Sequence, residues 1–345
     1  MGTGQTAAKQ PPLRAAQPEN TLSVLVQPMP ALALTRLRPW MHAGLLLLTL
    51  GSTFFTFLVT FGGAGYGLAG AGMFSVSLLC ILGMHEMGHY VLSRRHGVDC
   101  TLPYFLPAPL LGVGTLGAVI RVRSPIPHKD ALVDIGAAGP LAGAAVAVPV
   151  LAVGLWLSPV VPAGLPESTW PAEGSLWDVA QRAWAAWRGV SWASPPGAGG
   201  FAFVFGDPPL LLALRWLVHG PLPAGMDVQS HPLVISGWFG LLVTLLNLLP
   251  VGQLDGGHVA YAWLGRRAEW VGRVALGGLV YLAVFHAASW TAWLLVAALV
   301  VKVRHPPVLD EARPLSRGRK WVCAASFVLF CGCVMPAPLR LVPVP

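Results

Sequence analysis

The chain has 345 residues, of which 55% are hydrophobic and only 10% are charged. Because soluble domains carry about 25% charged residues, this composition excludes an ordinary soluble protein and indicates an integral membrane protein. The net charge of +8 does not indicate nucleic-acid binding, because the basic residues lie in short clusters between apolar segments, without interleaved aromatic residues.

The first segment, residues 1–38, is polar and contains several prolines. It lacks the basic n-region, apolar h-region and cleavage site that together make a secretory signal. We expect a disordered tail on the cytoplasmic side of the membrane.

Apolar segments of membrane-spanning length follow along most of the chain. A transmembrane helix needs about 20 predominantly apolar residues. The fold class that this pattern predicts is an all-α polytopic membrane protein with six to seven transmembrane helices. The predicted spans are 41–61, 73–93, 131–157, 233–249, one or two helices within 273–301, and 321–335.

The connection after the second span contains a β-like segment. Residues 117–122 mix β-branched and small residues, so we predict a small β element near 98–124 on the cytoplasmic side. This segment is either an ordinary interfacial loop or a strand that holds an extended peptide by edge pairing. The candidates for such a substrate strand are Gly117, Ala118, Val119 and Ile120.

The connection 158–232 is rich in proline, glycine and tryptophan. Tryptophan is enriched at the boundary between membrane and water. We therefore expect an extracytoplasmic or interfacial cap of short amphipathic helices.

Basic residues are distributed unequally between alternate connections. With the N-terminus in the cytoplasm and seven spans, 18 of the 22 Lys and Arg residues fall on the cytoplasmic side. Cytoplasmic loops carry an excess of Lys and Arg, so we predict this orientation. It places the histidines of the second span in the cytoplasmic half of the membrane.

The second predicted span contains the sequence LGMHEMGHY, with the pattern H-E-x-x-H. On a helix, His85 and His89 lie on one face, so both imidazoles can reach one zinc ion. Glu86 is too close to His85 in sequence to join as a third ligand, but it can act as the general base on water. Ionisable residues inside a span are costly, which favours this function over a buried structural pair of histidines.

A zinc peptidase needs a third protein ligand. A metzincin would have a third histidine at position 95, where this chain has Arg95. The downstream glutamates lie in connecting segments or near span ends, and they are Glu167, Glu173, Glu269 and Glu311.

Asp255, in the sequence NLLPVGQLDGGH, is the acid that fits best. It lies just past the cytoplasmic end of the fourth predicted span, at the depth of the two histidines. Pro250 disfavours helix at the preceding residue, and Gly256 and Gly257 allow close backbone approach. The chain can therefore break here and turn Asp255 toward the metal.

The pair of motifs, H-E-x-x-H in one span and N-x-x-P-x-x-x-x-D-G in a later one, resembles the site-2 protease family of intramembrane zinc metalloproteases. The resemblance covers about residues 41–303. It implies Glu86 as the catalytic base, and a place near the site for Asn247. The Asn247 amide either binds the substrate backbone or oxyanion, or makes a hydrogen bond between helices. The resemblance also implies one zinc ion per chain, held by His85, His89 and Asp255.

We therefore expect a metalloprotease core at 39–303 and a C-terminal segment at 304–345. The predicted function is hydrolysis of peptide bonds in or near transmembrane segments of membrane-protein substrates, in regulated proteolysis. A divalent-metal transporter and a catalytically silent scaffold are the alternatives; a transporter would be expected to show internal repeats. Arginine outnumbers lysine 18 to 4, as in GC-rich genomes, which favours a multi-pass protein of a bacterial inner membrane.

Overall fold

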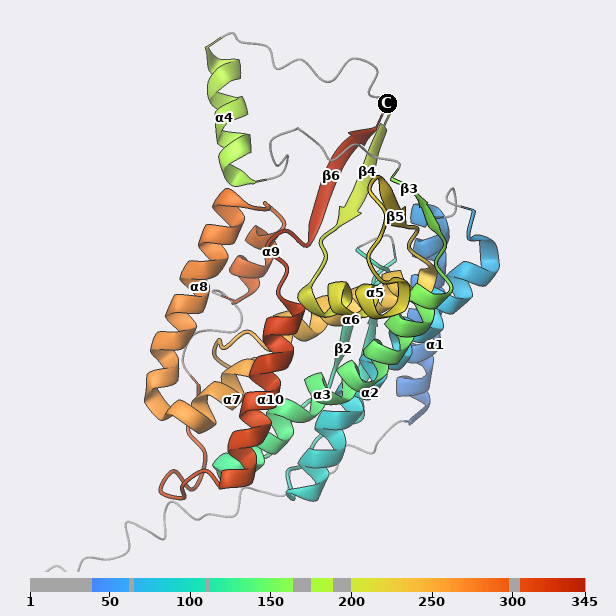
Figure 1. Cartoon of the computed structure of the whole chain (residues 1–345). Coiled ribbons are helices and arrows are strands. Elements are labelled where there is room, and N and C mark those ends of the chain that lie inside the picture. Colours follow the sequence, from blue (N-terminus) through green and yellow to red (C-terminus); the bar gives the residue numbers. More distant parts are fainter. Residues whose placement is uncertain are drawn as a thin grey trace, which may run out of the picture. The chain divides into compact units, whose positions relative to one another are not determined.

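The computed structural model describes residues 39–61, 65–109, 112–163, 175–188, 200–297 and 305–344. The predicted tail 1–38 lies outside the described residues, as do two parts of the connection 158–232. The described chain is mostly helical; β3, β4, β5 and β6 lie toward one end, whereas β2 lies among the helices (Figure 1).

Four helical stretches in the described part of the chain are long and apolar enough to cross a membrane. The first and third agree with the predicted spans to within two residues, the second begins six residues before the predicted start, and the fourth combines α7 and α8. The prediction of six to seven spans is not confirmed by length and composition. The four stretches are α1 (Pro39–Phe61), α2 (Gly67–Arg95), α3 (Lys129–Trp156) and Asp255–Phe285.

Helix α6 (Pro232–Asn247) is shorter than the predicted span 233–249. It has 16 residues, which is below the length of a full crossing. It ends early because Pro250 lacks a backbone N–H and disfavours helix in the residue before it. A new helix, α7 (Asp255–Leu264), then begins at the predicted ligand.

Helix α8 (Ala268–Phe285) begins before the predicted apolar block 273–301, after the single turn η2 (Gly265–Arg267). The charged residues at its start are tolerated because they pair locally. The Arg273 guanidinium lies 3.7 Å from the Glu269 carboxylate and 4.6 Å from the centroid of the Trp270 ring.

The sequence left open whether the apolar block 273–301 forms one helix or two. In the structure two helices occupy it, α8 and α9. After α8 a short turn leads to α9 (Trp290–Leu295). The buried indole of Trp290 donates a hydrogen bond to the Pro336 carbonyl at 2.9 Å, which holds the start of α9 against the segment after α10. Residues 298–304 lie outside the described part.

Helix α10 (Arg317–Cys333) begins before the predicted last span 321–335 and has 17 residues. Two contacts fasten its start to α3. The Arg319 guanidinium donates to the Asp134 carboxylate at 2.8 Å, and the Ser316 backbone N–H donates to Asp130 at 2.9 Å. The start of α10 is therefore fixed to α3.

The remaining described elements are short. Helix α4 and strands β3 to β6 lie toward one end of the molecule (Figure 1), whereas α5 packs on α3, with His219 Nε2 2.9 Å from the Leu155 carbonyl oxygen. Strand β3 pairs with β5, and β4 pairs with β6, so the chain's last strand joins the connection 158–232. Their bounds are α4 (Leu176–Trp187), α5 (Pro209–His219), β3 (Val160–Pro162), β4 (Gly200–Phe205), β5 (Met226–Val228) and β6 (Leu339–Val344).

The β element predicted near 98–124 is an antiparallel hairpin of β1 (Tyr104–Pro107) and β2 (Thr115–Val119). The predicted strand residue Ile120 lies just outside β2. Gly114, at the hairpin turn, packs directly on α1, where the Ser52 hydroxyl donates to its carbonyl at 2.6 Å. The hairpin is therefore held against the first helix.

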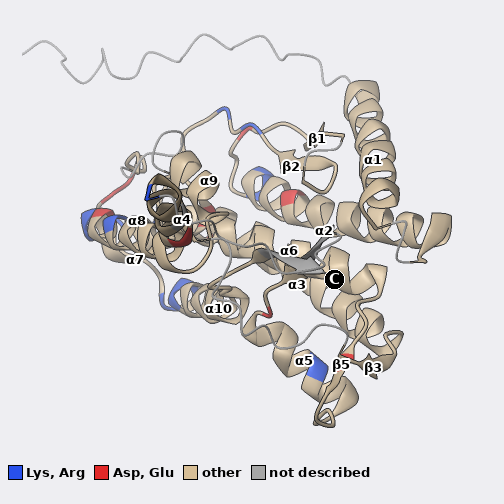
Figure 2. Ribbon diagram, turned by 90° about the horizontal axis from the view of Figure 1, so that it is seen from above, with Lys and Arg blue, Asp and Glu red and all other residues tan. Residues whose placement is uncertain are grey.

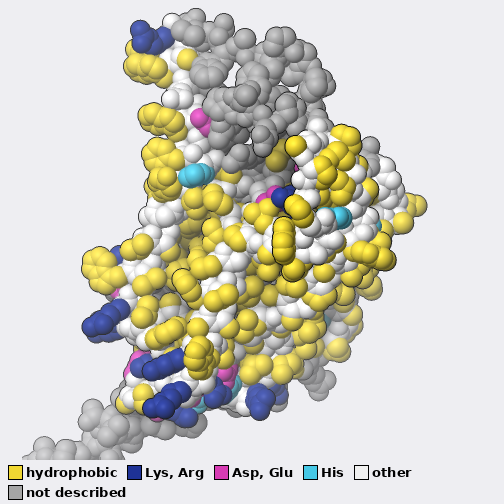
Figure 3. All heavy atoms as spheres, viewed as in Figure 1, with side chains coloured by type: hydrophobic (Ala, Val, Ile, Leu, Met, Phe, Trp, Pro, Cys, Tyr) yellow, Lys and Arg dark blue, Asp and Glu magenta, His cyan; other side chains and the backbone are white. Residues whose placement is uncertain are grey.

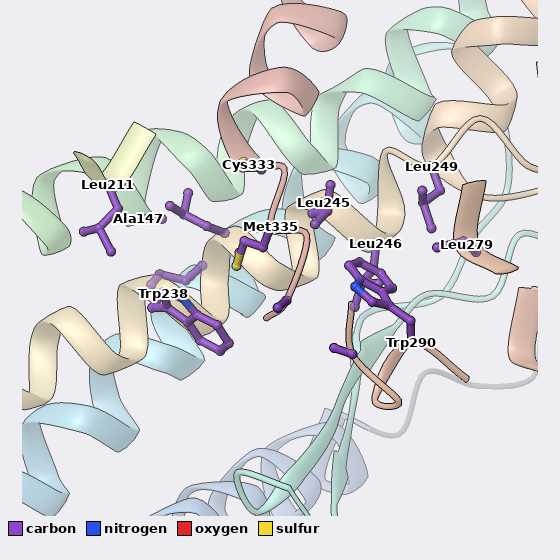
Figure 4. Packing of buried hydrophobic residues seen from close by; sticks show 14 of the residues in the cluster. Ala147, Leu211, Trp238, Leu245, Leu246, Leu249, Leu279, Trp290, Cys333 and Met335 are labelled. Carbon is purple, nitrogen blue, oxygen red and sulfur yellow. The ribbon is translucent and has the colours of Figure 1, made fainter. Parts of the chain in front are cut away.

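The largest hydrophobic cluster lies where α3, α6, α8 and the segment after α10 meet. Few charged segments appear among the helices when the molecule is seen from above (Figure 2). The indole of Trp238 in this cluster donates to the Gly206 carbonyl at 2.6 Å. Figure 4 labels ten of its members: Ala147, Leu211, Trp238, Leu245, Leu246, Leu249, Leu279, Trp290, Cys333 and Met335.

Candidate metal centre

The two histidines of the H-E-x-x-H pattern lie on one face of α2, buried against α3. Glycines in α3 make this close approach possible. A Cβ at Gly139 would lie 2.0 Å from the His89 Nε2 atom, and one at Gly143 would lie 3.2 Å from His85 Cβ. The small residues of α3 therefore leave the space that the two imidazoles occupy.

The His89 ring has a fixed orientation. Its Nδ1 atom lies 2.7 Å from the carbonyl oxygen of Ile135 in α3. A carbonyl can only accept a hydrogen bond, so Nδ1 carries the proton and the lone pair lies on Nε2. This is the tautomer that a metal-binding histidine requires.

Asp255 is placed by the turn between α6 and α7. Gly252 in this turn has φ 51°, a left-handed conformation that favours glycine. A Cβ at Gly256 would lie 2.0 Å from the Leu248 carbonyl oxygen, and one at Gly257 would lie 2.3 Å from the Gly252 carbonyl oxygen. The first turn of α7 can therefore pack directly on the turn that precedes it, and this packing fixes the position of Asp255.

Three ligand atoms converge from α2 and α7. The His85 Nε2 and His89 Nε2 atoms are 3.2 Å apart, and Asp255 Oδ2 lies 3.4 Å and 3.3 Å from them. A tetrahedral zinc ion with ligands at 2.0–2.1 Å separates any two of its ligand atoms by about 3.3–3.4 Å. Two imidazole nitrogens and one carboxylate oxygen are also a donor set that zinc uses. These residues therefore fit one zinc ion.

Glu86 and Asn247 lie beside these three ligand candidates. Both line a cavity of about 440 Å³, together with His85. Glu86 is buried, and the Ile120 backbone interacts with its carboxylate. The Asn247 side-chain Nδ2 atom lies 3.1 Å from His85 Nε2, so the amide reaches the ligand side of that ring from α6.

Strand β2 forms one wall of the same cavity. Its residues Thr115–Val119 all line the cavity, opposite α6 and the α9 residue Trp293. The two-stranded sheet gives β2 a single strand partner, β1, among the described residues. The structure thus brings the predicted strand residues Gly117, Ala118 and Val119 to the metal centre.

Two polar groups near the site were not predicted from the sequence. The Asp134 carboxylate is bound by His96 at 2.9 Å and by Arg319 at 2.8 Å, and so links α2, α3 and α10. His258 contacts His305, with 2.6 Å between His258 Nδ1 and His305 Nε2. The sequence signal for Asp134 was an acid near the start of a span, whereas His258 stands three residues after Asp255 and could be expected near the site.

The segment before α10 is held by Glu311. Its carboxylate accepts a hydrogen bond from Tyr261 at 2.8 Å, and lies 3.5 Å from the Lys129 ammonium. Burial alone would raise the pKa of Glu311, but the hydrogen bonds from Tyr261 and the Val308 backbone, with the nearby Lys129, lower it overall. The carboxylate is therefore held in its charged form.

A family model described as "Peptidase family M50" matches residues 73–285. This range covers more than half of the chain and includes both motifs of the metal centre. The chain belongs to peptidase family M50.

Curated relatives of this M50 chain are named zinc metalloproteases. It is 29% identical over 259 residues to "Probable zinc metalloprotease EGY1, chloroplastic" of Arabidopsis thaliana, covering 75% of this chain and 42% of the relative. It is 28% identical over 233 residues to "Probable zinc metalloprotease EGY2, chloroplastic" of Oryza sativa subsp. indica, covering 67% and 36%. For "Probable zinc metalloprotease EGY3, chloroplastic" of the same rice, the identity is 30% over 256 residues, covering 70% and 38%.

The M50 chain spans less than half the length of these relatives. No solved structure gave a significant match. Family membership and the four long apolar helices identify an integral membrane protein. The expectation of a bacterial inner membrane is not supported, because the names of these relatives place them in chloroplasts.

Proposed function

We propose that the chain is a zinc-dependent intramembrane endopeptidase, which cuts transmembrane helices of membrane proteins near the cytoplasmic face. The convergence of His85, His89 and Asp255 beside Glu86, in the wall of an apolar cavity, carries this proposal. The names of the curated relatives support the same class of reaction. A role in regulated proteolysis is part of the proposal.

The proposed roles follow from the positions of the side chains. His85, His89 and Asp255 hold one zinc ion, which when bound supplies Lewis-acid polarisation of water and of the peptide carbonyl. Glu86 accepts a proton from the attacking water and delivers it to the leaving amine. The mostly apolar walls of the cavity disfavour other water beside the reacting peptide.

Strand β2 and Asn247 are proposed to hold the substrate. A transmembrane helix already uses its own amides in hydrogen bonds, so it has to unwind before a carbonyl is accessible. An unwound segment can pair with the edge of β2 that faces away from β1. The Asn247 amide can then donate a hydrogen bond to the developing oxyanion.

The proposed topology places the N-terminus in the cytoplasm, with six to seven crossings, a core at 39–303 and a C-terminal segment at 304–345. Four helix ends lie together at one end of the structure (Figure 1). They are the end of α2, the start of α3, the α7–α8 junction and the start of α10. These are the segments that carry most of the described basic residues, as expected for a cytoplasmic side.

A comparison of membrane fragments tests this function. Cells that express the wild-type chain or Glu86→Gln are compared by sequencing new peptide termini in their membrane fractions. We expect termini inside or next to transmembrane segments only with the wild-type chain. Identical fragment sets from the two kinds of cells would contradict the proposal and favour a catalytically silent scaffold. Metal uptake into vesicles that survives Glu86→Gln would instead favour the transporter.

A further inference from the structure

A second apolar groove lies behind the turn that carries Asp255. Its volume is about 380 Å³, and it runs between α7, the start of α8 and α10. Its walls include Val259, Trp263 and Val271 on one side and Cys323, Phe327 and Phe330 on the other. Since α7 and α8 belong to a candidate membrane span, the groove opens toward hydrocarbon rather than toward water.

The floor of this groove is the metal-site turn itself. Leu248 and Pro250 line it from the turn, and Gly256 lines it from the start of α7. Asp255 directly precedes Gly256 and is not itself among the residues that line the groove. An occupant of the groove would therefore press on the backbone that positions the third ligand.

Exposed tryptophans mark one end of the groove as the level of the lipid headgroups. Trp263, Trp270 and Trp321 are 48%, 66% and 79% exposed, and they lie at the end of α7, the start of α8 and the start of α10. Tryptophan concentrates at the membrane–water boundary because its ring is amphipathic.

The same end carries exposed basic side chains without an ion pair to any acid in the described residues. Arg267 lies one helical turn before the wall residue Val271, and Lys320 lies one turn before the wall residue Cys323, so each continues a wall of the groove. Lys and Arg side chains gather along the lower edge of the face in Figure 3, where α7 meets α8 and α10 begins. The exposed basic residues are Arg266, Arg267, Arg317 and Lys320.

We propose that this groove binds an anionic phospholipid. One acyl chain lies along the apolar walls, and the headgroup phosphate accepts hydrogen bonds from Arg267 and Lys320. Basic pockets between membrane helices are suited to anionic headgroups. A zwitterionic lipid is a poorer match, because its own cation would lie among these four unpaired positive charges. The bound lipid would stabilise the turn between α6 and α7.

Native mass spectrometry of the full chain, released from detergent, tests lipid binding without relying on protease activity. The probes are phosphatidylglycerol and phosphatidylcholine with the same acyl chains. We expect the wild-type chain to retain phosphatidylglycerol at least about tenfold more than phosphatidylcholine. Each basic residue near an anionic headgroup contributes about fivefold in affinity, and two such residues contact the phosphate. Equal retention of the two lipids would overturn the proposal.

Two variants distinguish the contribution of the headgroup to lipid binding from that of the acyl chain. Arg267→Gln with Lys320→Gln should lower phosphatidylglycerol retention to the phosphatidylcholine level. Ala260→Phe, which adds a ring inside the groove, should lower retention of both lipids. A preference for phosphatidylglycerol that survives both variants would exclude this groove.

Matched controls remove the same charge or add the same ring elsewhere. Arg95→Gln with Arg121→Gln changes two exposed basic residues outside the groove, and Ala325→Phe adds a ring on the exposed face of α10. Both controls should retain lipid as the wild-type chain does. A dimer that disappears only with Ala260→Phe would overturn the proposal in favour of a second copy of the chain as the occupant.

Discussion

Two backbone features of α3 fix the position of His89, one of the proposed metal ligands. The Ile135 carbonyl fixes the tautomer of the ring, and Gly139, one turn further along α3, leaves the space that the ring fills. Outer partners of this kind typically alter metal affinity by about 10–100-fold when they are lost. The metal centre therefore depends on residues that have no ligand atom of their own.

Gly139→Ala should weaken zinc binding. The added methyl group would lie 2.0 Å from His89 Nε2, so the ring has to move out of the ligand position. We expect roughly a tenfold or larger loss of zinc affinity, measured by competition with a chelator. Gly277→Ala is the matched control, because a Cβ there meets nothing within 4 Å. Equal affinities in the two variants would contradict this account of the packing.

The ligand set can be tested separately from the base. Purified wild-type protein should contain about one zinc ion per chain. His85→Ala and Asp255→Ala should each lower that content, whereas Glu86→Gln should keep the zinc and lose cleavage. Elemental analysis of the purified variants gives the result. Unchanged zinc in Asp255→Ala would remove Asp255 from the ligand set.

Asn247 reaches His85 across the interface between α6 and α2. Asn247→Ala should lower the cleavage rate about 100-fold if the amide stabilises the oxyanion, while zinc content and melting temperature change little. Single-turnover cleavage of a transmembrane substrate measures the rate. A variant that loses melting temperature but cleaves at the wild-type rate would indicate a hydrogen bond between helices instead.

At the scale of the elements, β2 takes part in both the hairpin and the cavity wall. One edge of the strand pairs with β1, and the whole strand lines the cavity that contains Glu86. Successive residues of a strand direct their N–H groups to opposite edges. Neighbouring positions in β2 therefore serve either the hairpin or the free edge.

Proline substitution at Ala118 and at Val119 should separate these two edges. Whichever proline removes a donor from the pairing with β1 should lower the melting temperature. The proline that instead removes a donor from the free edge should slow cleavage of a helical substrate, while the zinc content stays normal. Substrates with a helix-breaking glycine near the cut should be affected less. If neither proline slows cleavage in a stably folded variant, substrate unwinding has to be assigned to another element.

Element boundaries were predicted well only where the apolar pattern was uninterrupted. The helices α1 and α3 agree with their predicted spans to within two residues. Helix α2 begins at Gly67, six residues before the predicted start, because the glycine-rich residues 67–72 were interpreted as a link although they are helical in the fold. The start of α8 was misplaced because Glu269 and Arg273 read as polar residues in the sequence, whereas in the fold they pair with each other. Local pairing of this kind cannot be derived from hydropathy alone.

The convergence of His85, His89 and Asp255 could be predicted from the sequence, because both motifs constrain the local geometry. The spacing of His85 and His89 fixes their shared face, and Pro250 signals the break before Asp255. The Arg319–Asp134 contact could not be predicted, since its partners lie 185 positions apart and neither belongs to a motif. Tertiary packing decides such pairs, and one sequence contains no record of it.

At the scale of the whole molecule, the helix ends that carry basic residues lie together, away from α4 (Figure 1). Cysteine labelling of a variant without the native cysteines tests whether these ends face the cytoplasm. Arg95→Cys should react from the cytoplasmic side, and Trp187→Cys, an exposed residue of α4, should react from the opposite side. Labelling of both positions from one side would overturn the proposed topology. The residues to be replaced first are Cys80, Cys100, Cys323, Cys331 and Cys333.

The division of the ligand set between α2 and α7 has a consequence for biosynthesis. Chains are made from the N-terminus, so His85 and His89 enter the membrane long before Asp255 is synthesised. Until α7 is inserted, the nascent chain carries two histidines facing α3 and lacks the carboxylate that completes the donor set. A stalled or truncated product that ends before Asp255 would thus contain Glu86, the proposed general base, but only two of the three candidate metal ligands. The complete set of ligands would form only after most of the helices have been synthesised and inserted.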